Sequence, residues 1–415
     1  MNFDSRRDRA ALVGLAGFFI TGLIVAVGTA WAFQRGANDF NVFYEAWRLV
    51  LDGRGSGVYT STPDRYLYAP GFAWILAPLG VFPRNIALAI WCFAKAGAIG
   101  LVLQTFRRAF NNQGLTWGTM ACAWATLIVA RPLLIDFQYG QVNTFILAAC
   151  VWAVVPRFNL SRASSWDGIR WAVLAIAALA KIYPLPLLVV PWVVTHGISE
   201  ARLRRERWGV AIGLGLIFSV PMISLGWGGT LNLLLGWRDA LVARGMPMES
   251  HNQSFTALLH HYFAGEATHV ISRGWEQVKF GFGWISPGTL SLLTLAWTFG
   301  TLGIVLGWLV AGPAPSPVRW SGIAVGLPII SSYLIWKPYM VMALPAAILA
   351  LRDTIVDHLR DESIARFCVL VVIFAGLNLS GFDFVGNELS GRFEAASGLL
   401  LMHLMLLGLV RTRRE

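Results

Sequence analysis

The chain has 415 residues, of which 56% are hydrophobic and 13% are charged, and its formal net charge is +11. This composition is too apolar for a soluble domain and fits a protein that crosses a membrane many times. The basic residues occur in short clusters between apolar stretches, which is typical of cytoplasmic loops and argues against a nucleic-acid partner.

The first apolar stretch, 10–33, predicts a membrane helix that is not cleaved. It follows Arg6, Arg7 and Arg9, as the core of a signal peptide would. However, it is about 24 residues long and has no convincing small-residue cleavage site. We therefore expect it to be the first membrane span.

The first polar interval, 34–84, follows this span and is the first outer loop of the predicted topology. It carries Asp39 close to its start, where a carboxylate would lie at the membrane surface. From 42 to 50, apolar residues recur at helical spacing, with Tyr44 and Glu45 on the opposite face. This pattern predicts a helix that lies in the interface and does not cross the membrane.

Further apolar stretches bring the expected number of crossings to about twelve. They are 85–106, 115–133, 141–156, 169–182, 184–197, 208–225, 285–311, 321–336, 338–351, 365–381 and 394–410. The segment 68–82 is short and contains Pro70 and Pro78. If it crossed, Arg107 and Arg108 would move to the outer face, so we take the topology in which it does not cross. Both termini are then cytoplasmic.

This topology places a group of polar side chains at or just below the outer surface of one integral membrane domain, residues 1–415. They are Asp39, Arg84, Asp136, Gln138, Gln141, Asn143, Lys181, His251, Asn252, Gln253 and Lys337. Charges and amides at membrane depth are costly, so they tend to face a cavity or a partner. A second long outer loop is expected at 226–283, with a short helix over the cavity. The site is therefore expected on the extracytoplasmic side.

Five segments, in order, resemble the polyprenyl-phosphate-dependent glycosyltransferases of the GT-C class, and within them the GT87 family, which includes bacterial mannosyltransferases. The segments are DFNVFYEAWRLVLDGRGSGVY, YLYAPGFAWILAPLGVFP, YGQVNTFILAA, ALAKIYPLPLLVVP and HNQSF. The resemblance implies an all-α polytopic GT-C fold with interfacial helices in the first outer loop. It also implies an acid in that loop as general base, and a lipid-phosphate sugar as donor.

The resemblance weakens towards the end of the chain. A histidine is expected in a late outer turn, whereas this sequence has WKPYM at 336–340. Either Lys337 takes the place of the histidine or this turn has no part in binding.

Glycosyl transfer requires a base for the acceptor hydroxyl and positive groups for the departing phosphate. Asp39 is the candidate base, and a single base with in-line attack inverts the anomeric centre. The structural alternative is that Asp39 caps the helix starting near Phe40. Glu45 is a second, weaker candidate, more typical of a solvated helix face.

Lys181 and Arg84 are the candidate phosphate ligands, together with His251, Asn252, Gln253 and Lys337. An isolated lysine in an apolar stretch is costly unless it meets an anion. The alternatives are that Lys181 extends to the headgroups and that Arg84 anchors the interface. Gln141 and Asn143 could bind sugar hydroxyls or cap a helix.

Tyr44 and Tyr68 could stack on a sugar, although aromatic belts at the interface explain most such residues. We expect no metal and no cofactor, because Glu249 with His251 is a poor metal site. The cysteines all lie in apolar runs and predict neither disulfides nor a zinc site. They are Cys92, Cys122, Cys150 and Cys368.

The sequence thus predicts a membrane glycosyltransferase that passes a mannose-like sugar or a pentose from a polyprenyl phosphate to a lipid-linked or cell-envelope acceptor. The alternative from another class is a transporter or flippase for lipids or small molecules. Transporters often show inverted repeats, and no internal repeat is visible here. A third possibility is an inactive relative that only binds lipid.

Overall fold

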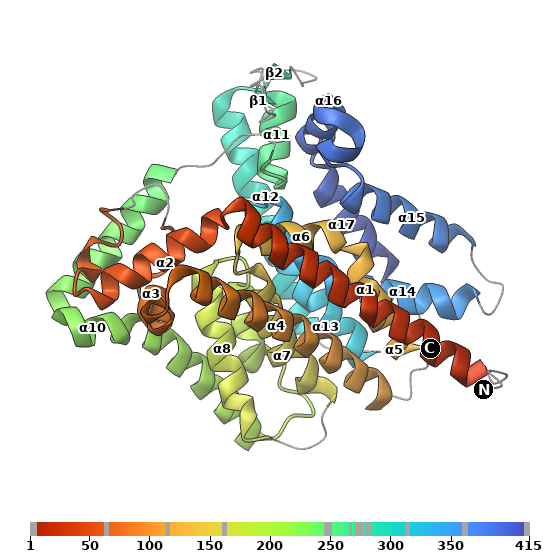
Figure 1. The fold of residues 1–415 in the computed structure, drawn as a ribbon, viewed down its shortest axis with the longest axis horizontal. Helices are drawn as coiled ribbons and strands as arrows, with labels where there is room; N and C mark the ends of the chain where they lie inside the picture. The colour runs from red at the N-terminus through yellow and green to blue at the C-terminus, as the bar shows by residue number, and fades with distance from the viewer. Residues whose placement is uncertain are drawn as a thin grey trace.

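The computed structural model describes residues 6–61, 66–112, 117–159, 164–244, 251–264, 268–269, 277–278, 284–311, 316–358 and 364–410. The described chain is almost entirely helical (Figure 1), and the prediction of an all-α polytopic membrane protein is confirmed. The single sheet described is a two-residue pairing of β1 (Thr268–His269) with antiparallel β2 (Gln277–Val278).

The α-helices differ widely in length. In the first half they are α1 (Arg6–Arg35), α2 (Asn38–Leu51), α3 (Pro70–Leu76), α4 (Arg84–Asn112), α5 (Gly118–Ile128), α6 (Ala130–Tyr139), α7 (Asn143–Asn159), α8 (Trp166–Ala180), α9 (Val190–Val193) and α10 (Glu200–Arg244). In the second half they are α11 (Phe255–Phe263), α12 (Pro287–Ala311), α13 (Pro317–Gly326), α14 (Leu344–His358), α15 (Ile364–Asn378), α16 (Phe382–Ala395) and α17 (Gly398–Leu409). Short 3₁₀ segments are η1 (Gly55–Gly57), η2 (Ala77–Val81), η3 (Leu185–Val189), η4 (Leu327–Ser331) and η5 (Lys337–Ala343).

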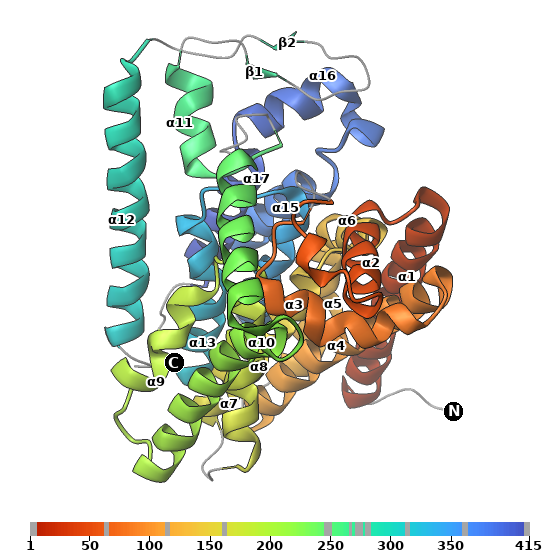
Figure 2. The same cartoon turned by 90° about the vertical axis from the view of Figure 1, so that its left-hand side faces the viewer.

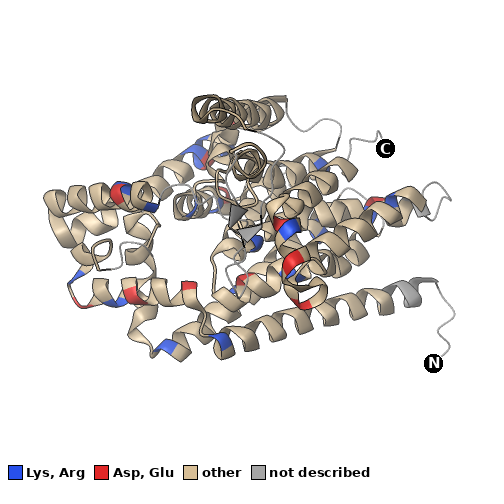
Figure 3. Ribbon diagram, turned by 90° about the horizontal axis from the view of Figure 1, so that it is seen from above, with Lys and Arg blue, Asp and Glu red and all other residues tan. Residues whose placement is uncertain are grey.

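Fewer helices than expected are long enough to span a bilayer. Among the described residues, five helices are long and apolar enough to cross, or up to seven if each bent pair counts as one span. The bent pairs are α5 with α6, at 62°, and α15 with α16, at 92°. Charged residues are sparse along most of the ribbon (Figure 3), in keeping with an apolar surrounding.

Prolines explain why two of the predicted spans are not continuous helices. The stretch 184–197 forms η3 and the four-residue α9, and it contains Pro184, Pro186 and Pro191. In 321–336, α13 gives way to η4 at Pro328. Because proline lacks an N–H and clashes with the preceding turn, a helix does not pass through it undisturbed.

The first outer loop contains the amphipathic helix that its periodicity predicts. α2 begins at Asn38 and buries Phe40, Phe43, Ala46 and Trp47, while Glu45 is exposed. The segment 70–81 follows as α3 and η2 and is about 18 Å long, too short to cross a core of about 30 Å.

The second long outer loop is shorter than predicted. Residues 226–244, expected to be loop, continue α10, which packs mainly against α8 and also contacts α3. At Gly226, φ is +67°, so the helix kinks there but does not end. α3 crosses α10 closely, because a Cβ at Gly71 would lie 1.9 Å from the carbonyl oxygen of Ile217.

The upper part of the molecule is formed by α11, the upper half of α10, α16 and the start of α12 (Figures 1 and 2). α7 lies in the interior, where it packs against α4, α8 and α13. α1 lies against α5 and α6 at one side. The turn between α6 and α7 lies beside the start of the first outer loop.

Candidate active site

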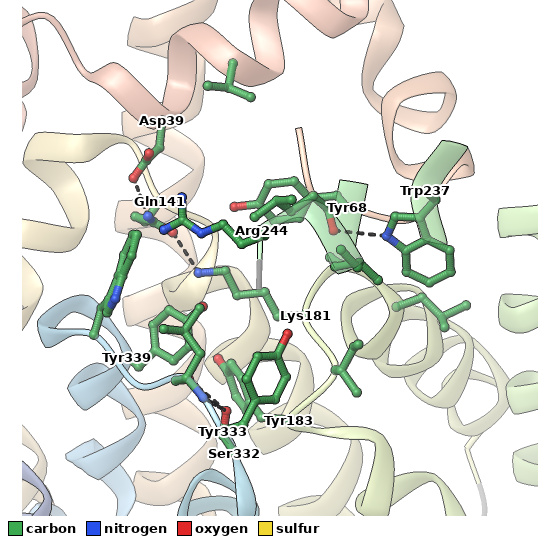
Figure 4. A pocket seen from close by; sticks show the side chains of 18 of the residues that line it. Asp39, Tyr68, Gln141, Lys181, Tyr183, Trp237, Arg244, Ser332, Tyr333 and Tyr339 are labelled. Carbon is green, nitrogen blue, oxygen red and sulfur yellow. Dashed lines mark hydrogen bonds between the residues drawn. The ribbon is translucent and has the colours of Figure 1, made fainter. Parts of the chain in front are cut away.

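A cavity of about 560 Å³ lies between α2, the start of α7, the end of α8, the end of α10 and the segment joining η4 to η5. Figure 4 shows its principal side chains. The lining includes Asp39, Asn41, Glu45, Tyr68, Gln141, Lys181, Tyr183, Trp237, Arg244, Tyr333, Trp336 and Tyr339. Polar and aromatic groups from segments far apart in sequence thus meet in one space.

One chain of hydrogen bonds joins an acid to a cation across this cavity. Gln141 donates from Nε2 to Oδ2 of Asp39 and accepts at Oε1 from Nζ of Lys181 at 2.8 Å. Oδ1 of Asp39 makes no hydrogen bond to any described residue. The carboxylate therefore keeps one oxygen for a ligand while the other is held in place.

A glycine places Gln141 beside Asp39. Gly140 ends α6 with φ of +68°, a conformation that glycine adopts without strain. A Cβ at this position would lie 2.5 Å from Cβ of Phe40. The turn is held by Trp91, whose indole N–H donates to the Gly140 carbonyl at 2.9 Å. The α6–α7 turn can therefore press against α2.

A buried ion pair lies behind the cavity wall. Lys95 and Asp136 are fully buried, and Nζ lies 2.7 Å from Oδ2. Asp136 also accepts from Asn143 at 3.0 Å and from Thr144 at 2.5 Å. Asn143 in turn accepts from Lys181 at 3.1 Å. The pair thus fixes the start of α7, including the amide that holds Lys181.

The environment of Asp39 acts on the pKa of its carboxyl group in two opposing ways, and the net effect raises the pKa. Burial raises the pKa of Asp39 above its ordinary value, while the Lys181 ammonium and the Gln141 hydrogen bond act in the opposite direction. Asp39 lies in the first turn of α2 and is not its cap, because the capping position is Ala37 and makes no side-chain bond. The capping alternative is therefore wrong.

Two cations in the cavity rest on aromatic rings. Nζ of Lys181 lies 3.9 Å from the ring centroid of Tyr339, and the Arg244 guanidinium lies 5.2 Å from that of Trp336. Nε of Arg244 is buried and makes no hydrogen bond to the described residues. Lys181 does not extend away to the surface. Arg244 extends into the same cavity (Figure 4).

Two of the predicted ligands lie near the cavity but do not line it. The Tyr44 hydroxyl donates to the Phe82 carbonyl at 2.9 Å. Arg84 donates from Nε to Oδ1 of Asn41 at 2.7 Å and from NH2 to the Gly36 carbonyl at 2.5 Å. Both side chains close the first loop onto itself and so support the position of α2.

A second polar cluster gathers the remaining predicted ligands away from the cavity lining. His251 and Lys337 both pair with Glu394, a buried carboxylate of α16 whose side chain is 4% exposed. Asn252 and Gln253 bond to backbone carbonyls of neighbouring segments. The expectation that these four residues share one site with Asp39 is therefore not met. In this structure they tie the segment before α11 to η5 and α16.

Sequence reasoning missed the aromatic wall and one cation. Trp336 and Tyr339 line the cavity, whereas the neighbouring Lys337 turns to Glu394. All three residues belong to the same short segment, but the directions of side chains in a 3₁₀ segment are not evident from the sequence. Arg244 is not singled out by the sequence, because the pattern of 226–283 predicts an outer loop. A lone cation after apolar Leu241 and Val242 was its available signal.

Comparison with known proteins gives a family match that covers more than half of the chain. A family model described as glycosyltransferase family 87 matches residues 66–332. Within that range lie Gln141, Lys181 and Arg244, whereas Asp39 precedes it. No solved structure matches the chain at a significant level.

Three curated proteins are similar to parts of the chain. An alpha-(1->3)-arabinofuranosyltransferase of Corynebacterium glutamicum is 28% identical over 227 residues, covering 52% of this chain and 47% of that protein. A polyprenol-phosphate-mannose-dependent alpha-(1-2)-phosphatidylinositol pentamannoside mannosyltransferase of Mycobacterium tuberculosis is 27% identical, covering 47% of this chain and 48% of its own length. Its namesake in Mycolicibacterium smegmatis is 29% identical, covering 50% and 56%. The chain spans about half the length of the curated relatives it matches.

Proposed function

The chain belongs to glycosyltransferase family 87, and from this premise we propose that it transfers a sugar from a polyprenyl phosphate to a lipid-linked or cell-envelope acceptor. Two similar proteins are named as dependent on polyprenol-phosphate-mannose, which supports this class of donor. The observation that carries the proposal is the cavity itself, in which the Asp39 carboxylate and the Lys181 ammonium are held by one amide.

In the proposed reaction, an acceptor hydroxyl oxygen attacks the anomeric carbon of the donor sugar. The bond from that carbon to the phosphate oxygen breaks, and the polyprenyl phosphate leaves with the bonding electrons. Asp39 takes the hydroxyl proton, using the oxygen that Gln141 does not occupy. Attack opposite the leaving group inverts the anomeric centre.

Lys181 and Arg244 bind the phosphate of the donor in this proposal. Both line the cavity and both rest on aromatic rings. The buried Nε of Arg244 lacks a hydrogen-bond acceptor among the described residues, and a phosphate oxygen would supply one. Lys337 and His251 are less suitable, because both already pair with the Glu394 carboxylate.

The other acids near the cavity are poorly suited to be a second catalytic carboxylate. Asp136 is fully buried, paired with Lys95 and absent from the lining. Glu45 lines the cavity but is exposed on the outer face of α2. A retaining mechanism requires a second carboxylate at the reacting carbon. We therefore assign Asp39 as the base and an inverting outcome.

The proposed orientation places the cavity on the extracytoplasmic side and both termini in the cytoplasm. It is supported by the basic clusters of the sequence, which gather at the opposite ends of the helices from Asp39. Arg107 lies near the end of α4, whereas α4 begins beside α2 at Arg84, and Arg202 and Arg319 lie in the first turns of α10 and α13. A lipid-linked donor would then enter from the outer leaflet.

The test uses purified protein with radiolabelled polyprenyl-phosphate sugars and a panel of envelope lipids. Asp39→Asn should reduce transfer by about 10²–10⁴-fold while donor binding persists, because a general base contributes about that factor. Glu45→Gln, on the same helix and the same cavity, is the matched control and should retain most activity. Full activity in the Asp39→Asn protein, or transfer from nucleotide sugars alone, would refute the proposal. A transporter would be insensitive to this change.

A further inference from the structure

A second cavity, of about 450 Å³, lies between α1 and α4. It is lined by the middle of α1, around Gly22, and by α4 from Ala96 to Arg107. The two helices run in opposite directions, and α4 begins at Arg84, close to the first outer loop. Arg107 therefore lies about 34 Å along the helix from that end. This cavity, here called the α1–α4 slot, is separate from the one that contains Asp39.

The slot exists because two helices pack on a third while barely touching each other. α1 and α4 both pack against α5, but they contact one another at few positions. Thr21 secures α1 to α5 through a 2.6 Å hydrogen bond with Thr126. Phe18 and Leu103 provide apolar walls. The gap between α1 and α4 is thus set by the way both helices sit on α5.

Small residues keep this gap open. Glycines on facing helices commonly allow close approach of the backbones. Here a Cβ added at Gly22 or Gly100 would meet no atom within 4 Å, and both residues line the slot. The missing side chains therefore leave space that a long apolar chain can occupy.

A cation stands at one end of the slot. Arg107 lines it, and its Nε is buried without a hydrogen bond to any described residue. Gln104, about one turn earlier, also lines it, and no carboxylate does. A guanidinium with an open donor next to an apolar slot matches a phosphate group attached to a hydrocarbon chain.

We propose that the α1–α4 slot binds an anionic phospholipid, with its phosphate on Arg107 and one acyl chain between Gly22 and Gly100. A neutral zwitterionic lipid fills the slot equally well but offers the guanidinium no net charge. A polyprenyl phosphate is disfavoured because its phosphate would lie at the far end of α4 from Asp39. The basic end of α4 instead suits the leaflet whose anionic lipids attract arginine.

The test adds dioleoyl phosphatidylglycerol or dioleoyl phosphatidylcholine to the purified full chain in detergent and counts retained lipids by native mass spectrometry. The wild type should retain one phosphatidylglycerol and should prefer it to phosphatidylcholine by about fivefold, because the choline cation offsets the attraction between its phosphate and Arg107 whereas the glycerol headgroup does not. Arg107→Gln should abolish the preference. Arg108→Gln, at the exposed neighbouring position outside the slot, is the matched control and should keep it.

Filling the slot provides an independent test. Gly100→Leu should prevent retention of both lipids, whereas Gly97→Leu, the same change at an exposed position of the same helix outside the slot, should not. If the Gly100→Leu protein does not give a monodisperse peak, Gly22→Leu tests the opposite wall. Equal retention of the two lipids, or unchanged preference in Arg107→Gln, overturns the proposal. So does complete displacement of phosphatidylglycerol by an equimolar polyprenyl phosphate.

Discussion

The Asp39 carboxylate and the Lys181 ammonium are partners of one amide group, that of Gln141, which donates to the first and accepts from the second. The acid and the cation are therefore held in a fixed relation before any ligand arrives. Electrostatics couples them as well, because the ammonium lowers the pKa of the acid. Changing any member of this trio should alter the behaviour of the other two.

Replacing Gln141 by leucine should weaken catalysis more than binding. The change leaves Asp39 and Lys181 without the group that orients both, and a hydrogen bond to a charged group contributes about 1.5–3 kcal/mol. We expect kcat to fall by about 10–100-fold, with a smaller rise in KM for the donor. Gln138→Leu is the control, since Gln138 bonds to Arg35 outside the cavity. Equal losses in both variants would show that the amide has no special role.

Activity should be lost as the pH falls, at a higher pH than for an ordinary aspartate. A base acts only when deprotonated, and burial raises the pKa of Asp39. The rate should therefore be full above this raised pKa and should decline as the pH falls through it. Because Lys181 lowers the pKa of Asp39, Lys181→Met should move the acid limb of kcat/KM to still higher pH. A limb that does not move would contradict the assignment of Asp39 as base.

Replacing Arg244 by glutamine should weaken the binding of the donor and leave the binding of the acceptor nearly unchanged. The loss of one charge-assisted or bidentate hydrogen bond to the phosphate should raise KM for the lipid-phosphate sugar by about tenfold to hundredfold. The KM for the acceptor should change little. Arg238→Gln provides a matched control on the same helix, because Arg238 is exposed and paired with Asp239. If inorganic phosphate and polyprenyl phosphate inhibit the Arg244→Gln and wild-type proteins equally, Arg244 does not bind phosphate.

Breaking the Lys95–Asp136 pair on one side should destabilise the fold strongly. Both side chains are fully buried, and removing one partner leaves an uncompensated charge, at a cost of about 3–5 kcal/mol. Thermal unfolding in detergent should show this loss for Lys95→Met and for Asp136→Leu. The double variant should recover part of it, since no charge then remains unpaired. An additive double variant would show that the two groups do not depend on each other.

Gly140→Ala should impair the site from a distance. The alanine would have to adopt a positive φ, and its Cβ would collide with Phe40. The resulting strain is about 1–3 kcal/mol. Relief requires the α6–α7 turn to move away from α2, which would separate Gln141 from Asp39. We expect lower kcat together with lower thermal stability. Gly97→Ala, where a Cβ meets nothing within 4 Å, should leave activity intact and stabilise α4 by about 0.5–1 kcal/mol.

The sequence predicts the fold class, the α2 helix and four of the cavity residues, because periodicity and isolated charges in apolar stretches are local signals. Lys181 is such a charge, Asp39 follows the first apolar stretch directly, and Gln141 begins another apolar stretch. Fewer continuous helices of spanning length are present than hydropathy predicts, because prolines divide stretches such as 184–197 and 321–336 into short helical segments. The sequence also does not indicate which of the cations forms an ion pair with an acid. Lys337 pairs with Glu394, a residue of α16 that lies far from it in sequence, and no local pattern indicates this contact.

The contact between Lys181 and the ring of Tyr339 has a consequence for the end of each catalytic cycle. An ammonium that already rests on a π-face gains less from an incoming anion than a bare one would, since the new bond replaces an existing attraction. In the proposed reaction, the polyprenyl phosphate that remains after transfer would therefore bind Lys181 only loosely and leave quickly. We expect Tyr339→Leu to tighten the binding of this product and to slow turnover.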